Sequence, residues 1–498
     1  MLQAHSRMSA LTKPLKGHLT PALNLPNQAP MAEKLYSISR AGDRRGRPSP
    51  SKAQAKVHIF SLGCAKNRVD SEVMLGHLLE GGLEPVGDAE SADVLIVNTC
   101  GFIGDARQES MDAIAEMSEV KARSKGKKLV VTGCLSQVAA PELAKAWPGV
   151  DAFLGSGDAD KILATVKKAG PTRAPKHAFP DPDFTLTAAS PRVLSLAYSA
   201  YVKISEGCSN TCAFCSIPSM RGKQKSRTIA DVVAEVNNLR AAGVVEVNLI
   251  GQDLCAFGKD RGEGESLAGL LRALDAISIG EQPYWIRCLY AYPRGLTQEV
   301  QSILAGAEHI VPYLDMPLQH ASDAVLRRMR RGKGGLATRE LVERLRKNHT
   351  RLTLRTTFLV GFPGETKDDF AELVQFVKDM QFERMGVFSF SIEEVTPSAH
   401  MPDQVPHELA EERRATLLEV QKKISRKQHA AYRGKTLDVL VEGVSEESEL
   451  LLQGRHSCQA PEVDGVTYIN DGSAKAGDVV RVKITQSGDY DLVGGIVG

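Results

Sequence analysis

The chain has 498 residues, 42% of them hydrophobic and 24% charged, a composition typical of a globular protein with about three domains. No apolar run reaches the ~18 residues that a membrane-spanning helix needs, which excludes a helical membrane protein. The formal net charge is +2, but residues 1–50 alone carry +6, which leaves −4 for the rest, so net charge does not make the body of the chain a nucleic-acid binder.

Nine cysteines, an odd number, occur without a secretory signal, which indicates a cytoplasmic, reducing location with free or metal-bound thiols. Residues 1–55 are rich in Pro, Ser, Ala and Arg and show little periodicity, which predicts a disordered leader. Two other interpretations of this segment are an organelle transit peptide and an early translation start, because Met31 lies downstream.

The first predicted domain covers residues 56–170. Three strand-like runs are each followed by a helical pattern, and this alternation predicts a parallel sheet with helices on its faces. The expected strands are Val57–Leu62, Asp93–Asn98 and Lys128–Thr132, and the expected helices are Ser71–Glu80, Asp105–Ala122 and Gln137–Trp147. Asp70, Ser71 and Glu72 are expected to begin the first helix as N-cap and first-turn residues.

A cysteine follows the end of each of these strands: Cys64, Cys100 and Cys134. Because the carboxyl ends of parallel strands lie along one edge of an open sheet, the three thiols are expected to meet there. Three thiolates without an evident fourth suit a four-iron cluster with one open iron, since ordinary electron-carrying clusters use four cysteines. The other interpretation is three buried structural thiols, because free cysteine is often buried.

Residues 171–195 contain five prolines and predict a linker. In residues 196–430, strand and helix patterns alternate six times, which predicts a parallel partial barrel. The expected strands are Ala200–Ser205, Glu246–Ile250, Tyr284–Tyr290, Tyr313–Met316, Leu354–Val360 and Met385–Phe390. The expected helices include Ile229–Ala242, Ser266–Ile277, Leu296–Ala305, Ala321–Met329, Thr338–Asn348 and Lys367–Met380.

The motif Cys208-x3-Cys212-x2-Cys215 follows the first of these strands, at the end of the barrel where active sites lie. Three thiolates again suit a four-iron cluster, whose open iron can bind a substrate or a cofactor. Structural zinc normally takes four ligands, so a zinc knuckle with a distant fourth ligand fits the spacing poorly. A chance grouping of buried cysteines is the remaining interpretation.

Polar residues and a glycine follow the other strands, and together they could hold a nucleoside cofactor at the same cavity. The candidates are Gln252, Gln319, Gly361 and Glu365. A basic run is formed by Arg327, Arg328, Arg330 and Arg331. It is expected to be a solvated helix end, with a contact to RNA or to an acidic partner as the other interpretation.

The third predicted domain covers residues 431–498. A helix-like stretch, Glu411–Arg426, precedes five short strands separated by turn signals, which predicts a small antiparallel barrel of the OB-like kind. The strands are expected at Thr436–Val441, Leu450–Gln453, Thr467–Ile469, Val479–Ile484 and Tyr490–Gly494. Residues 433–498 hold eleven acids and six bases, so this module is expected to attract a basic protein rather than phosphate. A merely solubilising surface is the other interpretation.

The C-x3-C-x2-C motif on a partial barrel resembles the radical S-adenosylmethionine enzymes. With the three upstream cysteines and a TRAM-like terminal barrel, residues 56–498 resemble the methylthiotransferases. Four strings resemble the branch that modifies an aspartate of the small-subunit ribosomal protein S-twelve: 201–208 (YVKISEGC), 217–222 (IPSMRG), 313–322 (YLDMPLQHAS) and 355–366 (RTTFLVGFPGET). One departure is Leu254-Cys255, where this branch often has a Thr-Ser-like pair; it leaves the cluster cysteines untouched but weakens the case for polar contacts at these two positions.

The resemblance implies two [4Fe–4S] clusters, a radical cluster on Cys208, Cys212 and Cys215 and an auxiliary cluster on Cys64, Cys100 and Cys134. It places Gln252, Gln319, Gly361 and Glu365 in the S-adenosylmethionine pocket. It assigns no catalytic residue beyond the cluster ligands.

The same resemblance implies the reaction. One-electron cleavage of S-adenosylmethionine gives a 5′-deoxyadenosyl radical, which takes hydrogen from the aspartate β-carbon. The auxiliary cluster supplies a sulfur that a second S-adenosylmethionine methylates. Because the two clusters must come close, the strand-end edge of the first domain is expected to face the barrel mouth.

The implied partners are ribosomal protein S-twelve as substrate and a reductase or flavodoxin-type electron donor. Neither a membrane nor direct nucleic-acid binding is expected to be part of the main function. One alternative is a tRNA adenosine methylthiotransferase, which uses the same chemistry. An alternative of another class is a nonenzymatic zinc-dependent binding protein.

Overall fold

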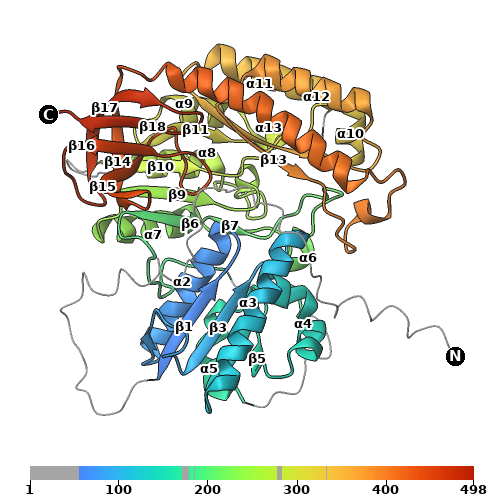
Figure 1. Ribbon diagram of the computed structural model, residues 1–498, viewed down its shortest axis with the longest axis vertical. Coiled ribbons are helices and arrows are strands. Elements are labelled where there is room, and N and C mark those ends of the chain that lie inside the picture. Colours follow the sequence, from blue (N-terminus) through green and yellow to red (C-terminus); the bar gives the residue numbers. More distant parts are fainter. Residues whose placement is uncertain (1–54, 171–178, 184, 278–282, 333) are drawn as a thin grey trace.

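The computed structural model describes residues 55–170, 179–183, 185–277, 283–332 and 334–498. Three main sheets follow one another along the chain. Figure 1 shows the N-terminal sheet below the central sheet, with the C-terminal barrel at the side of the central sheet. The predicted fold class is confirmed. The predicted leader lies outside the described residues except for Ala55, and so does part of the predicted linker.

The N-terminal sheet is parallel throughout, with strand order β2-β1-β3-β4-β5. Its strands are β1 (Lys56–Ser61), β2 (Glu84–Pro85), β3 (Val94–Thr99), β4 (Lys128–Gly133) and β5 (Ala152–Phe153). Its helices are α2 (Ala65–Glu80), α3 (Gly104–Arg123), α4 (Cys134–Ala146) and α5 (Ile162–Lys168). The three longer strands are largely buried because α2 and α5 pack on one face and α3 and α4 on the other.

Helix α2 begins six residues earlier than predicted, at Ala65, with Cys64 as its N-cap. The prediction that Asp70, Ser71 and Glu72 begin this helix is therefore wrong. All three lie inside the helix and are buried, because the central sheet covers this side of α2. These three polar residues resembled a helix start because the sequence does not show that the central sheet packs on this side of α2.

The central sheet contains six parallel strands in the order β13-β12-β11-β10-β9-β6, an open partial barrel as predicted. The strands are β6 (Ser199–Lys203), β9 (Glu246–Ile250), β10 (Trp285–Cys288), β11 (Ile310–Asp315), β12 (Thr353–Val360) and β13 (Arg384–Ser389). The helices are α6 (Ile217–Arg221), α7 (Ile229–Ala241), α8 (Leu267–Asp275), α9 (Gln298–Gly306), α10 (Asp323–Arg328), α11 (Gly335–Asn348) and α12 (Lys367–Met380). A short antiparallel pair, β7 (Ser205–Glu206) and β8 (Lys225–Ser226), flanks the loop that carries Cys208.

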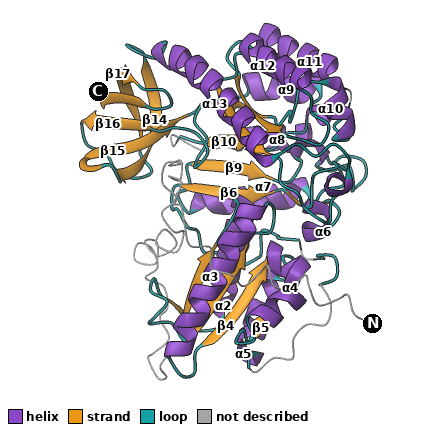
Figure 2. Cartoon of the chain, turned by 45° about the vertical axis from the view of Figure 1, so that its right-hand side comes forward, coloured by secondary structure: helices purple, strands orange, loops and turns teal. Residues whose placement is uncertain are grey.

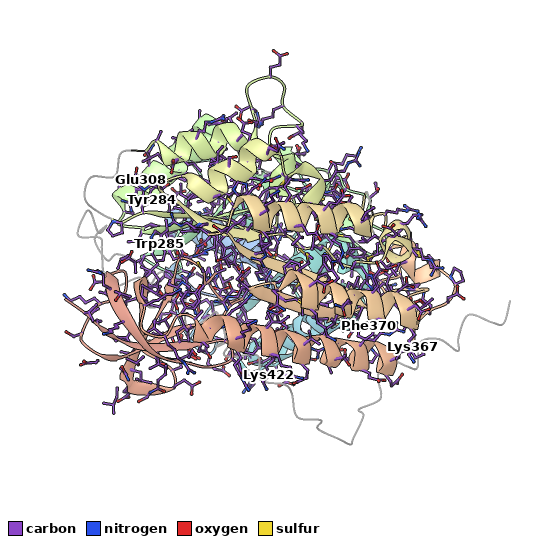
Figure 3. The ribbon with its side chains drawn as sticks, turned by 90° about the horizontal axis from the view of Figure 1, so that it is seen from above. Tyr284, Trp285, Glu308, Lys367, Phe370 and Lys422 are labelled. Atoms are coloured by element: carbon purple, nitrogen blue, oxygen red, sulfur yellow. The ribbon has the colours of Figure 1, made fainter. Side chains whose placement is uncertain are left out.

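Helix α13 (His407–Ala430) connects the central sheet to the C-terminal barrel. Seen from above in Figure 3, α13, which carries Lys422, lies beside α12, which begins at Lys367. The barrel closes in the order β14-β15-β16-β18-β17. Its strands are β14 (Thr436–Ser445), β15 (Ser448–His456), β16 (Thr467–Asp471), β17 (Val479–Ser487) and β18 (Leu492–Ile496). Four pairings are antiparallel, as predicted, and the pairing of β16 with β18 is parallel.

The inner face of the central sheet is covered at its base by the other two parts of the chain. Val69 of α2, Tyr201 of β6 and Tyr313 of β11 belong to one buried apolar cluster, which also contains Ala460 from the loop before β16. In Figure 1 the upper end of α2 reaches β6, and Figure 2 shows the strands of the three parts as separate groups. The base of the partial barrel is therefore packed, and the carboxyl ends of its strands are left for chemistry.

Buried ion pairs fix the C-terminal barrel to the central sheet. Glu246 of β9 lies 2.7 Å from Arg455 of β15 and 3.1 Å from Arg287 of β10. Burial alone would raise the pKa of Glu246, but the two arginines outweigh it and lower that pKa. A second contact is made by Asp464, which accepts a hydrogen bond from the Tyr313 hydroxyl at 2.7 Å. These contacts make the C-terminal barrel part of one packed structure.

The substitution Arg455→Met should lower the free energy of unfolding by about 3–5 kcal/mol, because it leaves the buried Glu246 carboxylate with only one cation. The control is Arg272→Met, which removes an ion pair to Glu299 whose two side chains are 60% and 51% exposed. That change should cost at most about 1 kcal/mol. Urea denaturation followed by circular dichroism measures both effects. Equal midpoints for the two variants would show that the Glu246 cluster does not hold the barrel in place.

Candidate functional site

The first trio, Cys64, Cys100 and Cys134, lies where the sequence placed it: Cys100 and Cys134 directly follow β3 and β4, and Cys64 is the third residue after β1. Asn67 holds this edge together, because its side-chain amide donates to the carbonyl oxygens of Leu62 and Thr99, both at 2.9 Å. The loops after β1 and β3 are thereby joined, and the cysteines that follow these two strands lie on adjoining loops.

Gly63 brings two members of the first trio close to each other. It has φ +89°, and a Cβ placed on it would lie 2.9 Å from the Cβ atom of Cys100. This is closer than non-bonded carbon atoms normally come, so a side chain at position 63 would push Cys64 and Cys100 apart.

Cys208, Cys212 and Cys215, the second trio, lie on a loop held from both sides. The backbone N–H of Cys208 donates to the carbonyl oxygen of Gly222 at 3.0 Å, and that of Ala213 donates to Met329 at 3.0 Å. The Asn210 amide lies 3.5 Å from the Cys208 sulfur. The loop is therefore fixed by α6 on one side and by α10 on the other.

Within each trio the thiols are close enough to influence one another. Burial raises the pKa of Cys134 to about 12, and the neighbouring Cys64 and Cys100 act in the same direction. Burial likewise raises the pKa of Cys215 to about 12, with Cys212 and Cys208 contributing. Without metal these two thiols are protonated at neutral pH, so binding of iron must release protons.

The three remaining cysteines lie elsewhere. Cys255 and Cys288 are buried in the core between the central strands and their helices, and Cys458 lies in the C-terminal barrel beside Tyr432. All nine cysteines fall within the described residues, and all are free. Two separate sets of three soft sulfur donors fit two iron–sulfur clusters, each with an open iron. Across the described residues, no three His, Cys, Asp or Glu side chains converge on a position for a single metal ion.

A buried charge network lies between the two trios. Lys203 of β6 donates to Asp70 of α2 at 2.5 Å and to Glu206 at 2.7 Å. Arg221 of α6 donates to the other oxygen of Asp70 at 2.8 Å. Burial disfavours the charged form of Glu206, but Lys203 and Arg221 outweigh it and lower its pKa to about 2. The two positive and two negative charges therefore sum to zero in this joint, the buried interface between the N-terminal sheet and the central partial barrel. The sequence did not predict this network.

The strand-end edge of the N-terminal sheet faces the barrel, as predicted. The N–H of Gly104, next to the first trio, donates to the Ser391 hydroxyl at 3.3 Å. Lys66 of α2 places its ammonium 3.1 Å from the centre of the Tyr290 ring, which follows β10. Burial lowers the pKa of Lys66 to about 8. The two trios therefore border the same joint.

Two of the four predicted cofactor residues offer polar atoms at the strand ends. Gln252 follows β9 and donates to Glu206 at 2.8 Å, while its side-chain oxygen is buried without a hydrogen-bond partner in the structure. Asp253, the next residue after the same strand, also has one buried oxygen without a partner, and its other oxygen accepts from Asn210 at 2.9 Å. Gln319 follows β11 with φ +73°. Unpartnered buried acceptors beside the second trio suit a bound cofactor with ammonium or hydroxyl donors.

The other two predicted residues shape a loop. Gly361 has φ +76° and follows β12. Glu365 is buried, and its carboxylate accepts from the N–H groups of Gly361 and Phe362. Arg413 of α13 lies 3.4 Å from the same carboxylate. Phe362 packs edge-to-face on Phe214, within the second trio's loop, so this turn supports the cysteine loop from the side.

The basic run at the end of α10 is only partly solvated, so that prediction needs correction. Arg331 stacks on Tyr292 at 4.1 Å and lies 3.6 Å from the Cys212 sulfur. Arg328 donates to the carbonyl oxygen of Pro363 at 3.3 Å. The sequence could not show this because charge patterning does not reveal that the helix end points at the cysteine loop.

Comparisons with known proteins agree with this geometry. Residues 56–155 match the uncharacterized protein family UPF0004, residues 202–377 match the radical SAM superfamily, and residues 434–497 match the TRAM domain. A protein of Anaeromyxobacter sp. (strain K) named "Ribosomal protein uS12 methylthiotransferase RimO" is 50% identical over 89% of this chain and 93% of its own length. A protein of the same name from Syntrophotalea carbinolica is 49% identical over 90% and 98%.

Among solved structures, the radical S-adenosylmethionine methyltransferase TsrM of Kitasatospora setae aligns with a TM-score of 0.50. The alignment covers 69% of this chain and 77% of that one at 16% identity, so it shows a shared fold only. In the described ranges, no helix is both long and apolar enough to cross a membrane.

The substitution Gly207→Ala should disrupt the second trio. Gly207 has φ +71°, and a Cβ there would overlap the carbonyl oxygens of Gly222 and Lys223. Gly243 has φ +95° with open space around it, so Gly243→Ala is a matched control that adds only the backbone strain of about 1–2 kcal/mol. Iron per chain after anaerobic reconstitution should fall by about half in Gly207→Ala and stay unchanged in Gly243→Ala. Full iron loading of Gly207→Ala would contradict the loop geometry.

Proposed function

This chain belongs to the ribosomal protein uS12 methylthiotransferase family of radical S-adenosylmethionine enzymes, and we propose that it adds a methylthio group to the β-carbon of an aspartate in uS12, the small-subunit protein S-twelve. The family membership rests on the relatives and family matches given above. The substrate comes from the names of those relatives.

One observation carries the proposal of a two-cluster enzyme: two cysteine trios border one buried joint. In our proposal Cys208, Cys212 and Cys215 hold the radical [4Fe–4S] cluster, and Cys64, Cys100 and Cys134 hold an auxiliary [4Fe–4S] cluster. Three ligands for each cluster leave one iron open on each side. The bound clusters and S-adenosylmethionine supply the radical, the sulfur and the methyl group.

The chain's own residues position these groups and exclude water. Gln252, Gln319 and Gly361 are the proposed contacts to S-adenosylmethionine, with Asp253 added because of its unpartnered oxygen. Glu365 is proposed to act indirectly, by holding the turn at Gly361. The charge network around Lys203, Glu206, Asp70 and Arg221 has no net charge, so the joint stays dry without leaving a charge unpaired.

A basic protein substrate suits the exposed surface. The C-terminal barrel has an excess of acids, and its Glu447 and Glu449 are both exposed at the start of β15. Close to the trios, Phe102 is 40% exposed and Ile392 is 60% exposed, on either side of the contact between Gly104 and Ser391. We infer that a basic, partly apolar segment of uS12 approaches along this junction.

Several finer assignments belong to the same proposal. The electron donor is a reductase or a flavodoxin-type protein, and the location is the cytoplasm, where ribosomal proteins are found. The proposed domain limits are 56–170 for the auxiliary-cluster domain, 196–430 for the radical domain and 431–498 for the TRAM domain, with 171–195 as a linker and 1–55 as a leader.

Single cysteine substitutions separate the two clusters. With a uS12 peptide and a chemical reductant under anaerobic conditions, Cys212→Ala should lose cleavage of S-adenosylmethionine. Cys100→Ala should still cleave it but insert no sulfur. Wild-type protein should hold about eight irons, and each variant about four. Liquid chromatography of 5′-deoxyadenosine and mass spectrometry of the peptide measure both steps. Normal sulfur insertion by Cys100→Ala would exclude an auxiliary cluster, and zinc without iron would favour a zinc-binding protein.

The substrate can be tested in cells. A strain lacking this protein should lose the methylthio group from uS12, seen as a mass loss of about 46 Da on the peptide that contains the aspartate, while methylthioadenosine in tRNA is unchanged. The control is the same strain carrying the wild-type chain in trans, which should restore the adduct. Loss of the modification from tRNA alone would instead identify a tRNA adenosine methylthiotransferase.

A further inference from the structure

We propose that Arg221 is a positioning residue for the auxiliary cluster, which it reaches from the radical domain by a hydrogen bond to the sulfur of Cys134. The inference rests on the proposed function, because it needs the auxiliary cluster to exist. It adds a role for a residue that is not a cluster ligand.

The Arg221 side chain makes a specific hydrogen bond to the Cys134 sulfur. The Arg221 Nε–H donates to the Cys134 Sγ atom at 3.2 Å. This sulfur belongs to the first trio, whereas Arg221 lies on α6, six residues after Cys215 of the second trio. Cys134 is thus the ligand of one proposed cluster held by the segment that directly follows the other.

The guanidinium is fixed on its remaining sides. Nη1 donates to Asp70 at 2.8 Å, Nη2 donates to the Asn67 side-chain oxygen, and Glu206 lies 3.3 Å from Nη1. The side chain is only 2% exposed. A planar guanidinium with donors in three directions fits these partners, whereas a lysine ammonium could not reach all of them. Arg221 is therefore held with Nε aimed at the sulfur.

The same segment also holds the second trio. Gly222, the next residue, accepts the N–H of Cys208 at 3.0 Å. Two adjacent residues therefore contact a cysteine of each trio, Cys134 through a side chain and Cys208 through the backbone. A shift of α6 would move both contacts together, so the distance between the two proposed clusters is fixed through Arg221 and Gly222.

The contact has a chemical consequence. A hydrogen bond from a cation to a ligating sulfur stabilises the added electron of a reduced cluster, because it withdraws negative charge from the sulfur. Arg221 should thus raise the reduction potential of the auxiliary cluster. A purely structural residue would affect stability or iron content without changing the potential of the clusters that do form.

The test uses a full-length background protein in which Cys208, Cys212 and Cys215 are all replaced by Ala, so that only the auxiliary cluster can assemble. Arg221→Met in this background should decrease the equilibrium constant for one-electron reduction at least about tenfold, which corresponds to a midpoint about 59 mV more negative. Arg221→Lys should give an intermediate shift because the charge is kept and the geometry is lost. Redox titration followed by electron paramagnetic resonance measures the midpoint.

Arg227→Met is the matched control. Arg227 is also 2% exposed and pairs with two carboxylates, Asp231 and Glu235, but it contacts the backbone of Lys203 rather than a cysteine. Its loss should leave the midpoint unchanged. A midpoint in Arg221→Met equal to that of the background protein would overturn the proposal.

A second measurement needs no change at Arg221. The background protein labelled with ¹⁵N-arginine should show one ¹⁵N nucleus coupled to the reduced cluster in pulsed paramagnetic resonance, and absence of this coupling would also overturn the proposal. If the background protein assembles no cluster at all, the two-cluster function fails instead, so the two failures are distinguishable.

Discussion

The structure depends on a small set of charges buried where the N-terminal sheet meets the central partial barrel. Asp70 comes from α2, Lys203 and Glu206 from the first strand region of the barrel, and Arg221 from α6. A lone buried charge costs several kcal/mol, and only the docked arrangement gives each of these groups its partner. Specific docking therefore follows from the need to neutralise these groups, in addition to the apolar contacts of α2.

This constraint decides where chemistry can take place. The apolar face of α2 and the loop around Ala460 fill the base of the barrel, so a cofactor can enter only at the carboxyl ends of the strands. The cysteine trios lie at that same level because each follows a strand end or a loop anchored there. The proposed reaction centre thus belongs to neither sheet alone, since the N-terminal sheet and the central sheet each bring three thiols to the same interface.

The sequence predicted the parts that obey local rules. Alternation of strands and helices gave both parallel sheets, and the rule that ligands gather at carboxyl strand ends placed Cys64, Cys100 and Cys134 correctly. It failed where a side chain's partner is distant in sequence. Asp70 appeared to begin a helix, yet it pairs with Lys203, which lies 133 residues later.

Arg331 and Arg221 show the same limit. Arg331 was expected to face solvent, and the sequence predicted no partner for Arg221, yet the side chains of both arginines contact cysteine sulfurs. The acidic character of the C-terminal barrel was visible from composition, but its attachment was not, since Arg455 and Glu246 become neighbours only in the folded chain. Local patterns locate the cysteines, and long-range pairing determines what surrounds them.

The link between Glu246 and Arg455 also bears on synthesis of the chain by the ribosome. The two residues are 209 positions apart, so at a synthesis rate of roughly 5–20 residues per second Arg455 is made roughly 10–40 s after Glu246. Until then the Glu246 carboxylate lacks its second arginine partner. During that interval Tyr313 at the base of the barrel lacks its partner Asp464, which is also made late. The C-terminal barrel, which is made after the central sheet, therefore completes the core of that sheet, and a chain truncated before the barrel would expose that core to chaperones and proteases.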